Sequence, residues 1–164
     1  MEKKSSIIKQ NIIAIAAVAV CVLLDQFTKS LAVIHLKGQN PLVLIQNIFE
    51  LLYLENQGAA FGIMQNMQIF FTIGAVVIIC VILYFWRKLP STRHYLPLRI
   101  CGVLLCAGAI GNMIDRICNN YVVDFFYFKV IDFPVFNVAD IYVTVACFLF
   151  AYLILFYYKE EDLI

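Results

Sequence analysis

Charged side chains are scarce in this sequence. Asp, Glu, Lys and Arg make up 14% of the 164 residues, whereas 63% are hydrophobic and the mean hydropathy is +0.89. This composition excludes an ordinary soluble domain and indicates a chain that lies in a lipid bilayer. The formal net charge is +1, with Lys and Arg in small groups, so no broad basic surface is available for nucleic-acid phosphates and nucleic acid is not an expected partner.

Histidine and paired-cysteine motifs are also lacking. The two histidines, His35 and His94, fall in different predicted loops, so no Ser/His/Asp arrangement offers itself, and the sequence contains no HExxH motif. The six cysteines lie in or at the end of apolar runs without CxxC or zinc-ligand spacing, which is typical of small buried side chains. No metal site and no cofactor are therefore predicted.

Four apolar segments are long enough to cross a bilayer, which takes about 20 mostly apolar residues. They predict transmembrane helices over residues 10–29, 67–86, 98–118 and 138–158. Because the connections are short, an all-α integral membrane fold is predicted, a single four-helix bundle over residues 1–164. The lysines before the first segment resemble the start of a secretory signal, but Val20 before Cys21 fits no cleavage site, so a retained signal-anchor helix is predicted.

The charges divide unequally between the two ends of the predicted bundle. Eight of the twelve Lys and Arg residues fall in the N-terminus, the loop over residues 87–97 and the C-terminus. Short loops rich in Lys and Arg mark the cytoplasmic side, so both termini are predicted to be cytoplasmic. Seven of the eleven acids fall at the other end: Asp25, Glu50, Glu55, Asp115, Asp124, Asp132 and Asp140.

Two loops connect the helices at this acidic end, over residues 30–66 and 119–137. The first holds two apolar runs but is interrupted by Glu50 and Glu55, so it predicts short strands or an interfacial segment and not a fifth span. The second is rich in aromatic residues, which suit the headgroup region of a membrane.

Two polar clusters lie at the acidic ends of the first and third predicted helices. Asp25 and Lys29 are four residues apart and share a helix face, so they can pair. The pair either anchors the helix end or forms a polar wall beside a reaction centre, since ionisable groups near membrane depth are costly unless they face the bundle interior.

Asn112, Asp115 and Arg116 share one stripe of the third helix, next to glycines that permit close helix approach. This stripe fits either a structural interhelical network or a site where the guanidinium orients a carboxylate or a substrate carbonyl.

Asp124 and Asp140 lie in contrasting local surroundings. Asp124 stands among valines and phenylalanines, where burial would raise its pKa and favour the neutral acid. Asp140 lies in the first turn of the fourth predicted helix, where the helix dipole favours the ionised form, although simple capping with Asn137 as N-cap also explains it. Two such carboxyls can share one proton, one activating water and the other protonating the departing amine, which is aspartic-peptidase chemistry.

Two other functions stay open on these residues. A metal-dependent lipid transferase would use Asp115, Asp124 and Asp140 to hold Mg²⁺ and a phospholipid headgroup. A non-enzymatic assembly or transport component would use the same charges only to hold the bundle together.

Five motifs, in order along nearly the whole chain, together resemble the bacterial lipoprotein signal peptidase family, also called signal peptidase II. They are Asp25-Gln26 with Lys29, Asn56-Gln57-Gly58-Ala59-Ala60-Phe61, the run Gly108-Ala109-Ile110-Gly111-Asn112-Met113-Ile114-Asp115-Arg116, Val122-Val123-Asp124-Phe125, and Phe136-Asn137-Val138-Ala139-Asp140. One departure is Ala107, where the family usually has glycine; its methyl group is expected to tighten helix packing and to leave the chemistry intact.

The resemblance implies a catalytic pair, Asp124 and Asp140. It also implies residues that position the substrate or support the site: Asn56, Gly58, Asn112, Arg116 and Asn137, with Asp25, Lys29 and Asp115 as the polar framework. The implied substrate is a pre-lipoprotein that carries diacylglycerol on a cysteine and is cut just before that cysteine.

The resemblance further implies a bacterial cytoplasmic (inner) membrane, with the site at the edge of the outer leaflet and membrane lipids around it. A small sheet and an interfacial helix formed by the first outer loop would lie over the site. The chain is expected to act as a monomer.

Overall fold

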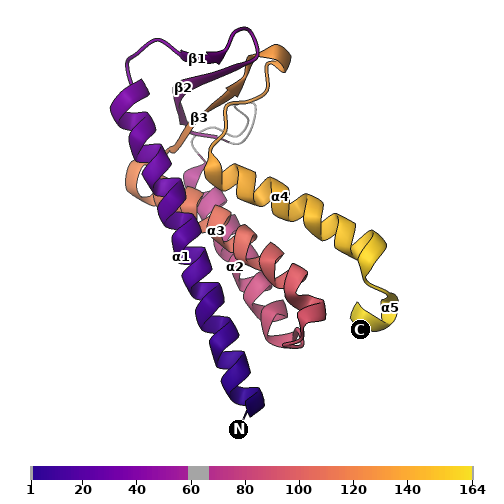
Figure 1. The fold of residues 1–164 in the computed structure, drawn as a ribbon. Coiled ribbons are helices and arrows are strands. Elements are labelled where there is room, and N and C mark those ends of the chain that lie inside the picture. The colour runs from indigo at the N-terminus through magenta and orange to yellow at the C-terminus, as the bar shows by residue number, and fades with distance from the viewer. Residues whose placement is uncertain (1, 59–66, 164) are drawn as a thin grey trace.

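Four long helices dominate the computed structural model, which describes residues 2–58 and 67–163 (Figure 1). They are α1 (Glu2–Leu36), α2 (Gln68–Lys88), α3 (Leu96–Asn119) and α4 (Val138–Tyr152), the last continued by the π-helical turn η4 (Leu153–Tyr157). Each of the four is long and apolar enough to cross a membrane. The predicted four-helix membrane bundle is confirmed.

A small antiparallel sheet covers one end of the bundle (Figure 1). Its strands are β1 (Leu42–Ile45), β2 (Phe49–Asn56) and β3 (Val122–Phe128), in the order β1-β2-β3. The first loop supplies β1 and β2, as the interrupted apolar runs predicted. The aromatic run of the second loop becomes β3, because it pairs with β2 and stacks on it, with the rings of Phe49 and Phe128 4.9 Å apart.

The first helix extends past the predicted end at Lys29. Its last turns carry Ala32 and Leu36, which are buried against Val123 and Phe125 of β3. The helix therefore continues because its end packs on the sheet, and it stops before Gly38, whose φ of +72° suits glycine. The interfacial helix implied for the first loop has no counterpart in residues 37–58, and residues 59–66 lie outside the described residues.

The third helix lies in the middle of the bundle and packs against α1, α2 and α4. Two of its glycines allow these contacts. A Cβ at Gly108 would lie 2.6 Å from the carbonyl oxygen of Ala139, and one at Gly111 would lie 2.6 Å from a carboxylate oxygen of Asp25. The predicted close approach thus occurs where α3 crosses α1 and the start of α4. Ala107, next to Gly108 on α3, is completely buried.

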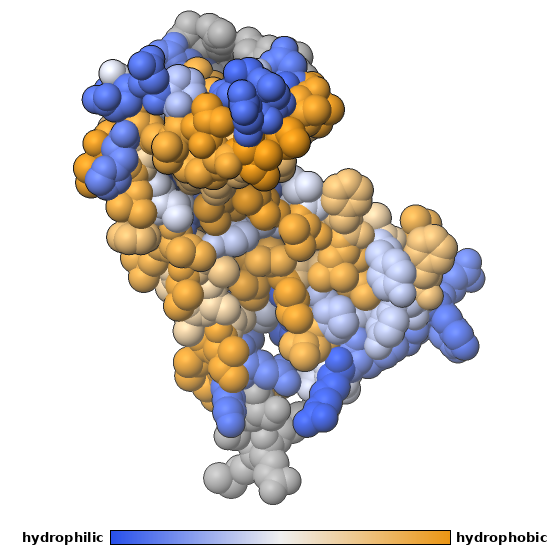
Figure 2. All heavy atoms as spheres, turned by 45° about the horizontal axis from the view of Figure 1, so that its top comes forward, coloured by the Kyte–Doolittle hydropathy of each residue, from blue (hydrophilic) through white to orange (hydrophobic). Residues whose placement is uncertain are grey.

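The surface of the bundle is largely apolar, and polar side chains gather at its two ends (Figure 2). Large exposed hydrophobic residues follow all four helices and the sheet. Such a surface is unfavourable in water and suits a lipid environment. Both chain ends lie at the end of the bundle away from the sheet (Figure 1), where short elements follow α2 and α4: η2 (Arg93–Tyr95) and α5 (Glu160–Leu163).

Candidate active site

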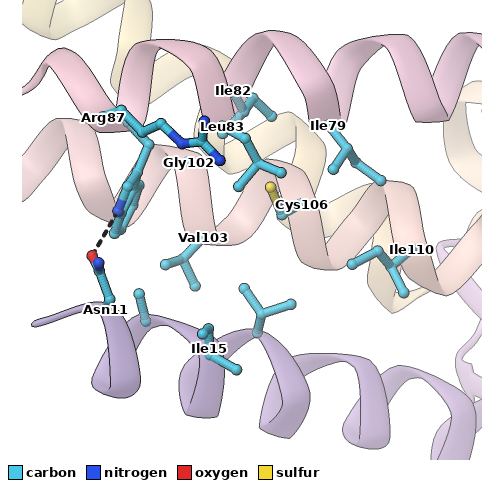
Figure 3. Close-up of a pocket in the computed structure, with 13 residues that line it drawn as sticks. Asn11, Ile15, Ile79, Ile82, Leu83, Arg87, Gly102, Val103, Cys106 and Ile110 are labelled. Carbon is cyan, nitrogen blue, oxygen red and sulfur yellow. Dashed lines mark hydrogen bonds between the residues drawn. The ribbon is translucent and has the colours of Figure 1, made fainter. Parts of the chain in front are cut away.

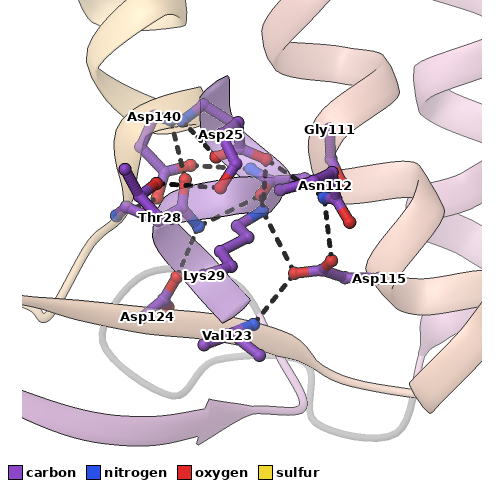
Figure 4. Close-up of polar contacts among 12 residues, drawn as sticks. Asp25, Thr28, Lys29, Gly111, Asn112, Asp115, Val123, Asp124 and Asp140 are labelled. Atoms are coloured by element: carbon purple, nitrogen blue, oxygen red, sulfur yellow. Dashed lines mark hydrogen bonds and ion pairs between the residues drawn. The ribbon is translucent and has the colours of Figure 1, made fainter. Parts of the chain in front are cut away.

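A polar cluster lies between the sheet and the helices, inside an otherwise apolar molecule (Figure 4). Its members come from two strands of the sheet and from three of the helices. They are Asn56 of β2, Asp124 of β3, Asp25 and Lys29 of α1, Asn112 and Asp115 of α3, and Asn137 and Asp140 at the start of α4. The fold thus brings together residues that are up to 115 positions apart, Asp25 and Asp140.

The ammonium group of Lys29 lies at the centre of the framework. Its Nζ lies 2.9 Å from Oδ2 of Asp25 and 3.0 Å from Oδ2 of Asp115, and it donates to Oδ1 of Asn112 at 2.9 Å. The side chain is only 3% exposed. The predicted pairing of Asp25 with Lys29 is confirmed, and a second carboxylate joins it. Three acceptors use the three N–H groups of the ammonium, so this buried charge is fully paired.

Each framework carboxylate also holds the backbone next to one of the predicted catalytic residues. Oδ2 of Asp115 accepts the N–H of Val123 at 3.0 Å, immediately before Asp124. Oδ1 of Asp25 accepts the N–H of Ala139 at 2.9 Å, immediately before Asp140. Lys29 therefore connects two carboxylates that each bind the backbone, one on β3 and one in the first turn of α4. In this way it fixes the positions of Asp124 and Asp140.

Gln26 belongs to this framework, although the sequence reasoning gave it no role. Its Nε2 lies within hydrogen-bond distance of three oxygens: Oδ2 of Asp25, the carbonyl of Gly111 and Oδ1 of Asp115, at 3.2, 3.1 and 3.1 Å. The amide thus helps to hold α1 against α3. Its position beside Asp25 in the first motif was the available indication.

Asp124 is held by two amide side chains from different elements. Nδ2 of Asn56 donates to Oδ2 at 2.8 Å, and Nδ2 of Asn137 donates to Oδ1 at 2.6 Å. The residue is 2% exposed. Burial, reinforced by the charge of Asp140, raises the pKa of Asp124 to about 7, against the lowering effect of the two amides and of Lys29. The direction predicted for Asp124 is confirmed, so this carboxyl can hold a proton near neutral pH.

Asp140 and Asn137 form a reciprocal cap at the start of α4. The backbone N–H of Asp140 donates to Oδ1 of Asn137 at 3.0 Å, and the N–H of Asn137 donates to Oδ2 of Asp140 at 3.1 Å. The predicted N-cap is confirmed, but capping is only part of the role of Asn137. Because its Oδ1 accepts the backbone N–H of Asp140, its Nδ2 is directed to Asp124. This completely buried residue thus binds both carboxyls, that of Asp124 through its side-chain amide and that of Asp140 through its backbone N–H.

Asn112 closes a second connection between the same groups. Its Nδ2 donates to Oδ1 of Asp140 at 2.8 Å, while its Oδ1 accepts from Lys29 and from Nδ2 of Asn137. The two carboxyls are thus connected through amide groups on a common network, with their oxygens oriented by named donors. Such support fixes functional groups more firmly than packing alone.

The side chains of the stripe on the third helix, Asn112, Asp115 and Arg116, contact two different helices. Asn112 and Asp115 face Lys29 of α1, whereas the guanidinium of Arg116 lies over the ring of Phe71 of α2, 4.9 Å from its centroid. Within the described residues the Nε of Arg116 is buried without a hydrogen-bond partner. Its Nη1 donates to the carbonyl of Asn112 at 3.4 Å, one turn earlier on the same helix.

The loop motif reaches the site through Asn56. The backbone N–H of Gly58, which is buried, donates to Oδ1 of Asn56 at 3.0 Å and so directs Nδ2 of the same amide to Asp124. The remaining motif residues Ala59, Ala60 and Phe61 lie outside the described residues.

A hydrolytic site in which two carboxyls share a proton needs two oriented carboxyls, one of which can stay protonated at neutral pH. Asp124 and Asp140 meet this description. Among the side chains of residues 7–58 and 67–162, no three His, Cys, Asp or Glu side chains are grouped as metal ligands. The two carboxyls together can perform acid–base activation of water.

A comparison with known families identifies the chain. The family model described as "Signal peptidase (SPase) II" matches residues 17–156, which include the polar cluster. The chain belongs to the signal peptidase II family. The family that the five motifs indicated is thereby confirmed, and in the structure the described parts of all five motifs meet in one site.

Relatives of the chain within this family match it over most of their length. The chain is 44% identical over 144 residues to a lipoprotein signal peptidase of Caldanaerobacter subterraneus subsp. tengcongensis, covering 87% of this chain and 96% of the relative. It is 43% identical over 146 residues to a lipoprotein signal peptidase of Symbiobacterium thermophilum, covering 87% and 95%. A solved structure described as a bacterial membrane enzyme, determined in meso at 2.3 Å resolution, aligns with a TM-score of 0.78 at 30% identity, over 90% of this chain and 92% of the other.

Proposed function

We propose that this chain is a membrane-embedded aspartic endopeptidase that removes signal peptides from pre-lipoproteins, with Asp124 and Asp140 as its catalytic pair. The observation that carries the proposal is the shared amide network, in which Asn137 and Asn112 orient both carboxyls while burial raises the pKa of Asp124 to about 7. Membership of the signal peptidase II family and the names of the relatives support the substrate class.

In the proposed mechanism the two carboxyls share one proton, held at rest by Asp124. Asp140 takes a proton from a water molecule as that water attacks the scissile carbonyl carbon, and Asp124 gives its proton to the carbonyl oxygen. The tetrahedral intermediate then collapses as Asp140 protonates the departing amine and Asp124 recovers a proton from the intermediate's hydroxyl group. The pair returns to its starting state, so no other proton carrier is needed. Arg116, whose guanidinium lies between Phe71 of α2 and the carbonyl of Asn112, positions the substrate in this proposal, as its place in the family motif implies.

The proposed cleavage point lies just before a cysteine that carries diacylglycerol. The polar cluster lies where the sheet meets the membrane-crossing helices (Figure 4), at the end of an apolar surface. At such a boundary the acyl chains of the substrate can remain in lipid while the scissile peptide reaches water between the carboxyls. This arrangement supports a lipid-modified substrate over a freely soluble peptide.

The proposed membrane is the bacterial cytoplasmic (inner) membrane, with both termini in the cytoplasm. Eight of the twelve Lys and Arg residues support this orientation. The site then lies at the edge of the outer leaflet. One chain supplies every residue of the polar cluster, which supports a monomer, and neither nucleic acid nor a cofactor is part of the proposed function.

The test is cleavage of a synthetic diacylglyceryl-modified lipobox peptide by the purified protein in detergent, with and without a chelator. Wild type is expected to cut before the lipidated cysteine at the same rate in both conditions. Asp124→Asn and Asp140→Asn are expected to lose activity by at least about 100-fold, the scale of an acid–base contribution, and to remain folded and inserted in membranes. Asp132→Asn is the matched control, because Asp132 is an exposed acid whose partner is Tyr127.

The alternatives give different results. Absence of cleavage by the folded wild type would support the metal-dependent lipid transferase or a non-enzymatic component, and loss of folding in both Asn variants would support a purely structural role. Loss of cleavage on chelation would contradict a pair of carboxyls that works without a metal. Near-normal turnover of either Asn variant would contradict the assignment of the pair.

A further inference from the structure

A second concave region lies within the bundle, away from the polar cluster. It is a cavity of about 390 Å³ between α1 and α2, with α3 behind it. Its volume falls in the range of about 300–1,000 Å³ that small-ligand sites occupy. Its walls are almost entirely apolar and include Ile15, Ile82 and Val103 (Figure 3). Helix α3 contributes the small residues Gly102 and Cys106 to the wall.

The two ends of this cavity differ in chemistry. Ile79 and Ile110 lie at the end nearer the sheet, whereas Asn11 and Arg87 lie at the opposite end (Figure 3). Oδ1 of Asn11 accepts the indole N–H of Trp86 at 3.0 Å, and its amide N–H groups form no hydrogen bond within the described part of the chain. The polar end thus combines an amide donor, an indole and a guanidinium, groups that suit the level of lipid headgroups.

The polar end is also cationic. Arg87 is exposed, and no acidic side chain in residues 7–58 or 67–162 forms an ion pair with it. Lys9, two residues before Asn11 in the sequence, is exposed as well. An occupant with an apolar tail and an anionic head complements both parts of the cavity.

We propose that this cavity binds an anionic phospholipid, with one acyl chain between α1 and α2 and its phosphate at Asn11 and Arg87. A signal peptide is a poorer match, because its N-terminal region is positively charged and would meet the same cations. The site lies in the leaflet at the chain-terminal end of the bundle, opposite to the polar cluster. It is therefore distinct from the substrate site and does not depend on the proposed peptidase activity.

The only tryptophan of the chain makes the proposal directly testable, since Trp86 lines the cavity. The protein is placed in phosphatidylcholine nanodiscs with a small fraction of brominated lipid, whose bromine quenches indole fluorescence. Brominated phosphatidylglycerol is expected to quench at about a fivefold lower mole fraction than brominated phosphatidylcholine with the same chains, as one basic residue near the surface predicts.

Two pairs of variants separate the cavity from the surrounding lipid. Ala14→Phe fills the cavity and is expected to abolish the preference for the anionic lipid, whereas Ala16→Phe, on the exposed face of the same helix, is expected to keep it. Arg87→Gln is expected to remove the preference, and Lys88→Gln to keep it, because Lys88 lies over Tyr84 and not in the cavity wall. Unchanged thermal unfolding of each variant establishes that it is folded.

Three results would overturn the proposal. Equal quenching by the two lipids would show no selective site, and a preference that survives Ala14→Phe would show only general attraction to a basic surface. Recovery of fluorescence when a synthetic signal peptide with a basic N-terminus is added would assign the cavity to that peptide instead.

Discussion

Replacement of Lys29 by methionine tests the framework that holds the site. Methionine keeps most of the volume of lysine but removes the charge that faces Asp25 and Asp115 at 2.9 and 3.0 Å. Both carboxylates are buried, so the substitution leaves two negative charges without their shared partner. Removal of one partner of a buried ion pair costs about 3–5 kcal/mol. For a chain of this size that corresponds to a fall of about 6 to 20 °C in the unfolding midpoint.

The assay is the free energy of unfolding in mixed detergent micelles, together with the thermal midpoint. Lys37→Met is the matched control, because Lys37 pairs with Glu55 at 2.8 Å but its side chain is 52% exposed. Exposed pairs contribute little, so this control is expected to unfold like wild type.

A triple variant tests the cause of the loss. Lys29→Met combined with Asp25→Asn and Asp115→Asn removes all three charges, while each Asn keeps an oxygen for the N–H groups of Ala139 and Val123. The triple variant is expected to be clearly more stable than Lys29→Met alone. If the two are equally unstable, the explanation by uncompensated buried charge is wrong and packing explains the loss.

The site geometry leads to four further predictions. Gly111→Ala is expected to destabilise the protein by about 1–3 kcal/mol and to reduce cleavage, because the added methyl group meets Asp25. Gly74→Ala is the control, because a methyl group there lies in open space. Equal stability and cleavage of the two variants would refute the close contact. The pKa of Asp124 is raised from 3.8 to about 7 in the folded state, so the folded protein binds this proton more tightly than the unfolded chain does. The thermal unfolding midpoint is therefore expected to fall as the pH rises from about 4 to about 7. Asp124→Asn is expected to remove this pH dependence. The rate of cleavage is expected to fall above about pH 7 as the shared proton is lost, and again in acid when both carboxyls are protonated; a flat profile in a folded protein would exclude a shared proton. Asn137→Ser keeps an N-cap but loses the amide N–H group that donates to Asp124, so the rate of cleavage is expected to fall with little change in the free energy of unfolding. Asn137→Ala also loses the cap, which is expected to lower the free energy of unfolding by about 1 kcal/mol.

The sequence alone determined the class of fold and the identity of the family. Composition and four long apolar runs require a membrane bundle, because a bilayer leaves few other ways to satisfy the backbone. The pair Asp25 and Lys29 was readable from helical spacing, and so was the cap at Asn137. These features are local, so a single stretch of sequence contains the information.

Only the tertiary structure decided how the polar residues are connected. That Lys29 also binds Asp115, that Gln26 joins both helices and that Asn137 links Asp124 to Asp140 depend on segments far apart in the chain. Strand β3 was likewise not predicted, since its pairing with β2 supplies hydrogen bonds that the loop sequence does not show. The first helix was predicted too short for the same reason: the contacts that prolong it, with Val123 and Phe125, form only when the sheet lies over its end. Local spacing determines which side chains share a face, but long-range packing determines what that face meets.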